Sequence, residues 1–215
     1  MVSFGLISEG PTDQIVIENI LFGFFKNPDL PINPLQPKPQ EAGNWVRVFD
    51  YCASSEFKSA LTFNDFLIIQ IDTDILIQEQ LPDAYKIDLP SDLSVEQIVE
   101  KLVDKFISLI DDDKHFWKNY GDRIIFAISV HSIECWLLPI YYSNQQRKAG
   151  KITGCLATLN EALQQKEGFY IDAKEERYYR TVAKKLKKQI KDIYPLNPSL
   201  RIFIENIEAK NIIIE

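Results

Sequence analysis

The stretch FLIIQIDTD, from Phe66 to Asp74, decides the fold class. Its first six residues are almost all apolar, which is typical of a strand buried on both faces of a parallel sheet. Asp72 and Asp74 follow at the end of this strand, and ligands of such sheets gather beyond the carboxyl ends of the strands. Burying an unpaired carboxylate is costly, so the two acids indicate a bound cation or several hydrogen-bond donors.

The rest of the chain alternates strands with helices. Apolar or alternating runs predict three further strands: Val2–Ser8, Trp45–Phe49 and Arg123–Val130. Apolar residues at helical spacing predict a helix that begins at Pro11, and the capping box of Ser94 and Gln97 predicts another. This alternation is typical of βαβ units. We therefore expect an α/β fold, with a mainly parallel sheet flanked by helices.

Two segments fall outside this pattern. Residues 27–43 contain five prolines and predict an extended loop inserted into the domain. Residues 1–142 form the predicted metal-binding domain, and residues 143–215 form a mostly helical extension packed on it. Leu200–Ile204 is expected to be a late strand within that extension.

Composition narrows the class of protein. The chain has 215 residues, 46% of them hydrophobic, which suits one domain with a substantial core. No apolar run approaches the roughly 18 residues of a membrane span, and residues 1–7 lack the basic start of a signal peptide. Cys52, Cys135 and Cys155 are odd in number and widely spaced, so we expect neither a zinc site nor a disulfide framework. We expect a cytoplasmic protein that does not bind membranes.

Charge is unevenly distributed along the chain. The net charge is −7, but Asp65–Asp113 carries 13 acids and 3 bases, whereas Lys174–Asp192 carries 8 bases and 3 acids. Basic residues recur on one predicted helical face at Arg177, Arg180, Lys184 and Lys188. This face would contact the phosphates of a nucleic acid, or Arg177 or Arg180 would steady a phosphate at the acidic site. The alternative is an ordinary solvated helix surface.

Three acidic motifs follow predicted strands: Ser8-Glu9-Gly10, Asp72-Thr73-Asp74 and Ser132-Ile133-Glu134. Their carboxylates are hard oxygen ligands, which suit Mg²⁺ or Mn²⁺ better than zinc. Each motif alone has an ordinary explanation, since the aspartates can accept backbone N–H bonds in a loop and Glu9 or Glu134 can cap a helix. Their conjunction is more specific, and it predicts convergence at one sheet edge.

The conjunction of Glu9-Gly10 after the first strand with Asp72-Thr73-Asp74 after the third resembles the TOPRIM family. The segment Ser132–Leu138 is similar to a further motif of small stand-alone TOPRIM-like bacterial proteins, which, like OLD-type nucleases, are associated with phage defence. The resemblance implies that Glu9 acts as general acid/base or ligand and that Asp72 and Asp74 bind Mg²⁺, with Glu134 completing the cluster. Two departures are the proline-rich insertion and Ile75-Leu76, where the family has glycine soon after the second aspartate.

The resemblance implies a divalent-metal-dependent nuclease or phosphodiesterase, with nucleic acid as substrate and a protein partner such as a defence-system ATPase. Two alternatives remain at this point. The first is a non-catalytic TOPRIM-like binding or regulatory module. The second is a phosphatase of the haloacid-dehalogenase type with Asp72 as nucleophile. A glycosyltransferase that uses the Asp72-Thr73-Asp74 motif has less support, because the sequence shows no other donor-binding feature.

Overall fold

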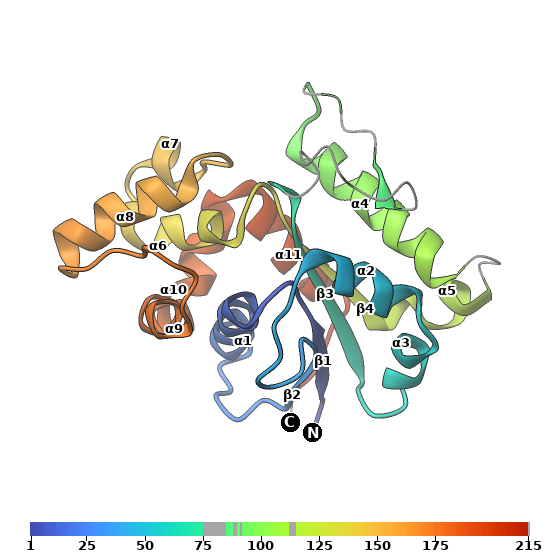
Figure 1. Ribbon diagram of the computed structural model, residues 1–215. Coiled ribbons are helices and arrows are strands. Elements are labelled where there is room, and N and C mark those ends of the chain that lie inside the picture. Colours follow the sequence, from blue (N-terminus) through green and yellow to red (C-terminus); the bar gives the residue numbers. More distant parts are fainter. Residues whose placement is uncertain (75–84, 88–89, 91, 112–114, 215) are drawn as a thin grey trace.

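The computed structural model describes residues 1–74, 85–87, 90, 92–111 and 115–214. Within these residues one all-parallel sheet is flanked by helices on both faces (Figure 1). Its order is β2-β1-β3-β4, and the strands are β1 (Phe4–Ile7), β2 (Ile32–Gln36), β3 (Phe66–Asp72) and β4 (Ile124–Ser129). The expected α/β fold is confirmed.

The register brings the acidic motifs to one edge of the sheet. Strand β1 pairs with β3, so that Ile7 lies opposite Ile69, and Asp72 at the end of β3 lies opposite Ser129 of β4. The first and third predicted strands are therefore neighbours. Because all strands run in the same direction, the residues after β1, β3 and β4 emerge at the same edge.

Helices cover the two faces with separate cores. Alternate strand residues explain the division, because Leu6, Ile68 and Ile125 join one core while their sequence neighbours join the other. The first face carries α1 (Pro11–Phe25), η4 (Ile133–Leu137), α6 (Leu138–Tyr142), α7 (Gln146–Ala149), α8 (Cys155–Lys166), α9 (Glu176–Ala183), α10 (Leu186–Ile193), η5 (Tyr194–Leu196) and α11 (Pro198–Ala209). The second carries α2 (Trp45–Ala53), α3 (Ser55–Ala60), α4 (Val95–Ile110) and α5 (His115–Tyr120), and η3 (Gly121–Arg123) connects α5 to β4.

The predicted strand Trp45–Phe49 is wrong, because this segment begins helix α2. The side chain of Asn44 accepts a hydrogen bond from the backbone N–H of Arg47 at 3.0 Å, which caps the helix. Val48, Phe49 and Cys52 are buried at helical spacing. The alternation of Trp45 to Phe49 was too short to distinguish the two periods, and the Asn44 cap was the missed signal.

The proline-rich segment is not wholly a loop, because it contains strand β2 between Ile32 and Gln36. This strand lies at the edge of the sheet and pairs only with β1 among the described strands. Pro34 is tolerated there because a residue of an edge strand can leave its backbone N–H position unpaired.

The late strand expected at Leu200–Ile204 is also wrong. These residues lie in helix α11, whose N-cap Asn197 accepts a hydrogen bond from the backbone N–H of Leu200 at 3.2 Å. Pro198 occupies the first turn, a position that helices favour. The expected helix at Pro11 and the capping box of Ser94 and Gln97 are confirmed.

None of the described helices is both long and apolar enough to cross a membrane.

Helices α1 and α10 cross closely at Gly23. A Cβ at this position would lie 2.7 Å from the carbonyl oxygen of Leu186 and 2.8 Å from the Cα of Lys187, which are backbone atoms with little freedom to move. This contact fixes the C-terminal helices against the helix that follows β1.

We predict that Gly23→Ala lowers the free energy of unfolding by about 1–3 kcal/mol, because the added methyl group overpacks this crossing. Urea denaturation measures the change. Gln165→Ala on the exposed face of α8 is the control and should change stability by no more than about 0.5 kcal/mol. Alanine normally favours a helix over glycine, so a stabilised Gly23→Ala protein would contradict the close crossing.

Candidate functional site

Four acidic side chains and one lysine gather beyond the carboxyl ends of β1, β3 and β4. Glu9 follows β1, Asp13 lies in the first turn of α1, and Asp72 ends β3. Glu134 lies in η4 after β4, and Lys174 lies between α8 and α9. The charges of these groups shift one another's pKa values, so they form one electrostatic unit, here called the acidic cluster.

Glu9 and Asp72 are joined through Gln70. The backbone N–H of Asp72 donates to Glu9 Oε1 at 2.5 Å, and the backbone N–H of Glu9 donates to Gln70 Oε1 at 3.2 Å. Gln70 Nε2 in turn donates to Asp72 Oδ1 at 3.0 Å. Gln70 was not among the predicted site residues, although a lone amide inside an apolar strand was the available signal.

Lys174 connects Asp72 with Glu134. Its Nζ lies 3.7 Å from Asp72 Oδ2 and 4.0 Å from Glu134 Oε1. The buried hydroxyl of Tyr179 donates a hydrogen bond to Glu134 Oε1. Neither Lys174 nor Tyr179 was among the predicted site residues, because no local pattern marks either contact.

Asp13, in the first turn of α1, is a member of the acidic cluster that the predicted metal ligands did not include. It is buried, and its Oδ1 has no hydrogen-bond partner within the part of the chain that the structure describes. A buried carboxylate oxygen without a donor is unfavourable. This atom therefore has the capacity to accept a hydrogen bond or to bind a cation.

The acidic cluster is short of positive charge. Burial, reinforced by the charge of Asp13, raises the pKa of Glu9 to about 8. Burial likewise raises the pKa of Asp13 to about 7 and, together with Asp13 and Glu9, raises that of Asp72 well above its usual value. Burial also acts on Glu134, but Lys174, Ser132 and Tyr179 outweigh it and lower the pKa of this carboxyl.

Asp74 lies at the rim of this arrangement. Its backbone N–H donates to the carbonyl of His131 at 3.0 Å, and the backbone N–H of His131 donates to Thr73 Oγ1 at 2.7 Å. The charge of Asp74 contributes to the raised pKa of Glu9, so the two acids are near each other. Ile75 and Leu76, which replace the glycine of the TOPRIM motif, lie outside the described residues.

A cavity of about 350 Å³ reaches the acidic cluster from solvent, with Glu9, Asp13 and Lys174 in its lining. Gly43 of the proline-rich segment also lines it, and a Cβ there would lie 1.9 Å from the carbonyl oxygen of Glu9. Only glycine permits this approach. The proline-rich segment, which was expected to be an inserted loop, therefore forms one wall of the candidate site.

The donor chemistry fits a divalent ion. The acidic cluster offers only hard carboxylate oxygens, carries more acids than bases, and includes the unpartnered Oδ1 of Asp13. The present arrangement is not a finished coordination shell, because no three His, Cys, Asp or Glu side chains converge for a metal within the described residues. Lys174 lies between two of the candidate ligands instead.

The predicted basic face divides into two parts. Arg177 pairs with Glu175 at 2.9 Å, and Arg180 pairs with Glu176 at 2.7 Å, so the ion pairs of both arginines go to neighbouring glutamates outside the acidic cluster. Lys184 and Lys188 are exposed and form no ion pair with a described residue. They are the members of the predicted set that are available to bind phosphates.

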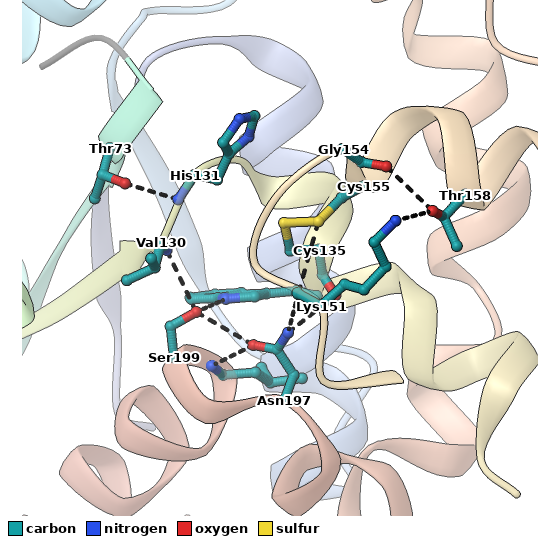
Figure 2. The surroundings of a disulfide bond; sticks show 12 residues. Thr73, Val130, His131, Cys135, Lys151, Gly154, Cys155, Thr158, Asn197 and Ser199 are labelled. Atoms are coloured by element: carbon teal, nitrogen blue, oxygen red, sulfur yellow. Dashed lines mark hydrogen bonds between the residues drawn. A yellow bond between two sulfur atoms is a disulfide. The ribbon is translucent and has the colours of Figure 1, made fainter. Parts of the chain in front are cut away.

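A disulfide joins Cys135 to Cys155, so the expectation that the cysteines would not pair is wrong. The 20-residue separation concealed that the turn η4 and the start of α8 lie side by side, as Figure 2 shows. Cys52 is free and buried. Because Cys135 directly follows Glu134, the disulfide anchors the turn that carries this carboxylate.

The same turn is held to helix α11 (Figure 2). Asn197 Nδ2 donates to the carbonyl oxygen of Cys135 at 3.3 Å. Ser199 Oγ accepts from Trp136 Nε1 at 2.8 Å and from the backbone N–H of Val130 at 3.3 Å. These buried bonds fix the chain on both sides of Glu134.

The sequence matches no known family model, and neither a curated protein nor a solved structure matches it.

We predict that the metal-free protein becomes less stable as pH rises from 5 to 8.5. The folded protein holds protons on Asp13 and Glu9 up to about pH 7 and about 8, whereas the usual values for these carboxyls are 3.8 and 4.5. Their stabilising contribution is complete below those lower values and is lost as pH rises through the folded values. Urea denaturation at each pH should show the free energy of unfolding falling by a few kcal/mol.

The combined Glu9→Gln and Asp13→Asn protein should show a much flatter pH dependence, because neither replacement titrates. Asp192→Asn on an exposed position serves as the control and should keep the wild-type slope. An unchanged slope in the combined variant would mean that other groups dominate the titration.

Proposed function

We propose that this protein is a divalent-metal-dependent nuclease or phosphodiesterase of TOPRIM type. The observation that carries the proposal is the gathering of Glu9, Asp13, Asp72 and Glu134 at one sheet edge around a single lysine. Such an excess of carboxylates suits a divalent cation. The resemblance of the Glu9-Gly10 and Asp72-Thr73-Asp74 motifs to the TOPRIM family supports the same activity.

Asp72, Asp13 and Glu134 are the residues we expect to hold Mg²⁺ or Mn²⁺, with Glu9 and Asp74 at its margin. When bound, the ion would polarise a phosphodiester and favour deprotonation of water. Gln70 would hold the Asp72 carboxyl group and the Glu9 backbone in fixed positions through its two hydrogen bonds. Glu134 would be oriented by Tyr179.

Glu9 is the best candidate for proton transfer. It lines the 350 Å³ cavity, where a substrate would enter, and burial raises its pKa to about 8. A carboxyl with a pKa near neutral can take up or release a proton at physiological pH. Lys174 lines the same cavity and would offer its ammonium to a phosphate oxygen.

Nucleic acid is the substrate class that we propose, with Lys184 and Lys188 of the basic face as its contacts outside the acidic cluster. These exposed lysines follow α9, the helix that supplies Tyr179, so they belong to the same part of the fold. A role in phage defence, a partner such as a defence-system ATPase and a cytoplasmic location belong to the same proposal.

A non-catalytic TOPRIM-like module is the alternative that one observation favours. Lys174 already pairs with Asp72 and Glu134, and the described side chains form no converged metal shell. If this ion pair is permanent, the acidic cluster stabilises the fold and does not bind a metal. A phosphatase with Asp72 as nucleophile has less support, because Asp72 is buried among other acids that raise its pKa.

We predict that purified protein cleaves single- or double-stranded DNA or RNA in the presence of Mg²⁺ or Mn²⁺ and that a chelator abolishes cleavage. Asp72→Asn should remove activity, and Glu9→Gln should reduce it about a hundredfold, because general acid–base catalysis contributes at least this much. Gel assays of all four substrates measure cleavage. Asp192→Asn is the matched control and should retain wild-type activity.

Cleavage that is equal in the wild type and in Asp72→Asn would identify a contaminating nuclease. Mn²⁺ binding without cleavage of any of the four substrates would favour the non-catalytic module.

We predict that neutralising Lys184 and Lys188 together weakens nucleic-acid binding without changing Mn²⁺ affinity. Each lost phosphate contact should reduce the slope of log K against log salt by about 0.9 for duplex DNA. Fluorescence anisotropy of the Lys184→Gln and Lys188→Gln double variant over a salt series measures both effects. The control neutralises two exposed lysines elsewhere, Lys26 and Lys118, and should preserve the wild-type slope.

A further inference from the structure

Lys174 holds the position that a metal ion would need. Its ammonium lies 3.7 Å from Asp72 and 4.0 Å from Glu134, and among the described residues it is the only cation that forms an ion pair with an acid of the acidic cluster. The side chain of Lys174 is 53% exposed, whereas those of both acids are only 2% exposed. The ammonium therefore reaches into a buried anionic site from a stem that remains accessible to solvent.

The chain around Lys174 is anchored at a distance on both sides. Ile171 is buried, and its backbone N–H and carbonyl each form a 2.8 Å hydrogen bond with the side chain of Asn160. Tyr179 is buried on the other side and bonds to Glu134. Residues 172–177 between these anchors are exposed. Lys174 can therefore leave the acidic cluster without unpacking either helix.

We propose that Lys174 is an exchangeable counter-ion that occupies the acidic cluster in the metal-free protein and is displaced when a divalent cation binds. The inference rests on the metal site of the proposed function but not on cleavage. An ammonium and a divalent ion repel each other and would require the same oxygens of Asp72 and Glu134. Binding of the ion therefore expels the lysine into the cavity that it already lines.

This exchange explains two features together. It explains why an ammonium occupies the buried oxygens of Asp72 and Glu134 in the absence of metal, and why no metal shell has converged among the described side chains. It also regulates the order of binding, because the displaced ammonium becomes available to an anionic phosphate only after the metal has entered. A permanent structural ion pair would show neither behaviour.

The first measurement is Mn²⁺ affinity by isothermal titration calorimetry at fixed pH and salt. Lys174→Met removes the competing charge while keeping the length of the side chain, and we expect it to bind Mn²⁺ about tenfold more tightly than the wild type. Lys174→Arg keeps a competing charge and should remain close to the wild-type affinity. Lys118→Met removes an exposed lysine outside the acidic cluster and controls for the loss of one positive charge.

The second measurement follows Lys174 in the wild-type protein and needs no stable variant. Endoproteinase Lys-C cleaves after lysine, and an ammonium held between two carboxylates is a poor substrate for it. Adding Mn²⁺ should accelerate cleavage after Lys174 about tenfold, which yields residues 1–174 and 175–215 by mass spectrometry. Cleavage after Lys184 should not change, and Asp72→Asn should lose the response to Mn²⁺.

Both results are required. Equal or weaker Mn²⁺ binding by Lys174→Met, or unchanged cleavage after Lys174 in the presence of bound Mn²⁺, would overturn the exchange. If Mn²⁺ binds to neither protein, the exchange and the metal site fall together. If both measurements succeed while no nucleic acid is cleaved, the exchange stands and only the nuclease activity is lost.

Discussion

The structure depends on an acidic cluster in which the buried carboxyl groups of Asp13, Asp72 and Glu134 and the half-buried Glu9 surround one ammonium. Burial alone would make this arrangement unfavourable, and the surrounding groups offset it with donors aimed at particular oxygens. The backbone N–H of Asp72 donates a hydrogen bond to Glu9, the side-chain amide of Gln70 donates one to Asp72, and the hydroxyl of Tyr179 donates one to Glu134. Asp13 Oδ1 is also buried, but it accepts no hydrogen bond from a described residue. The acidic cluster is therefore stabilised in part and remains receptive to a cation.

The C-terminal helices complete the site. Strand ends alone would supply Glu9, Asp72 and Glu134, but Lys174 and Tyr179 come from the region between α8 and α10. The close crossing of α1 and α10 at Gly23 fixes this region against the sheet. In Figure 1 α9 and α10 lie beside α1 on one side of the strands. The division into residues 1–142 and 143–215 therefore describes the order of the chain more than the construction of the site.

The turn that carries Glu134 is the most constrained part of this edge. The disulfide fastens its next residue to α8, and Asn197 and Ser199 fasten its backbone and Trp136 to α11. The segment that carries Lys174 has anchors only at its ends. One partner of the ion pair is thus fixed while the other can move. This asymmetry suits a site in which the ammonium yields to a ligand and the carboxylates remain in place.

The sequence by itself determined the parallel sheet and the acids at its edge. The apolar run from Phe66 to Ile71 can be stable only when both faces are covered, and the positions of Glu9 and Asp72 follow from where the strands end. Local hydrophobic patterns gave the wrong element where a short segment fits both the strand period and the helix period. This happened at Trp45–Phe49 and Leu200–Ile204, which the structure shows as helices. Helix caps at Asn44 and Asn197 would have corrected both.

Only the tertiary structure decided which charges meet. Lys174 is 102 residues from Asp72 in the chain, and Cys135 is 20 residues from its disulfide partner, so neither contact leaves a periodic or local signature. Asp13 looked like an ordinary acid at a helix terminus until packing buried it beside Glu9 and Asp72. Strand ends are fixed by local hydrophobicity, but the pairing of distant charges depends on how helices pack. For this reason the sequence pointed to Glu9, Asp72 and Glu134, and the fold added Asp13 and the lysine that pairs with Asp72 and Glu134.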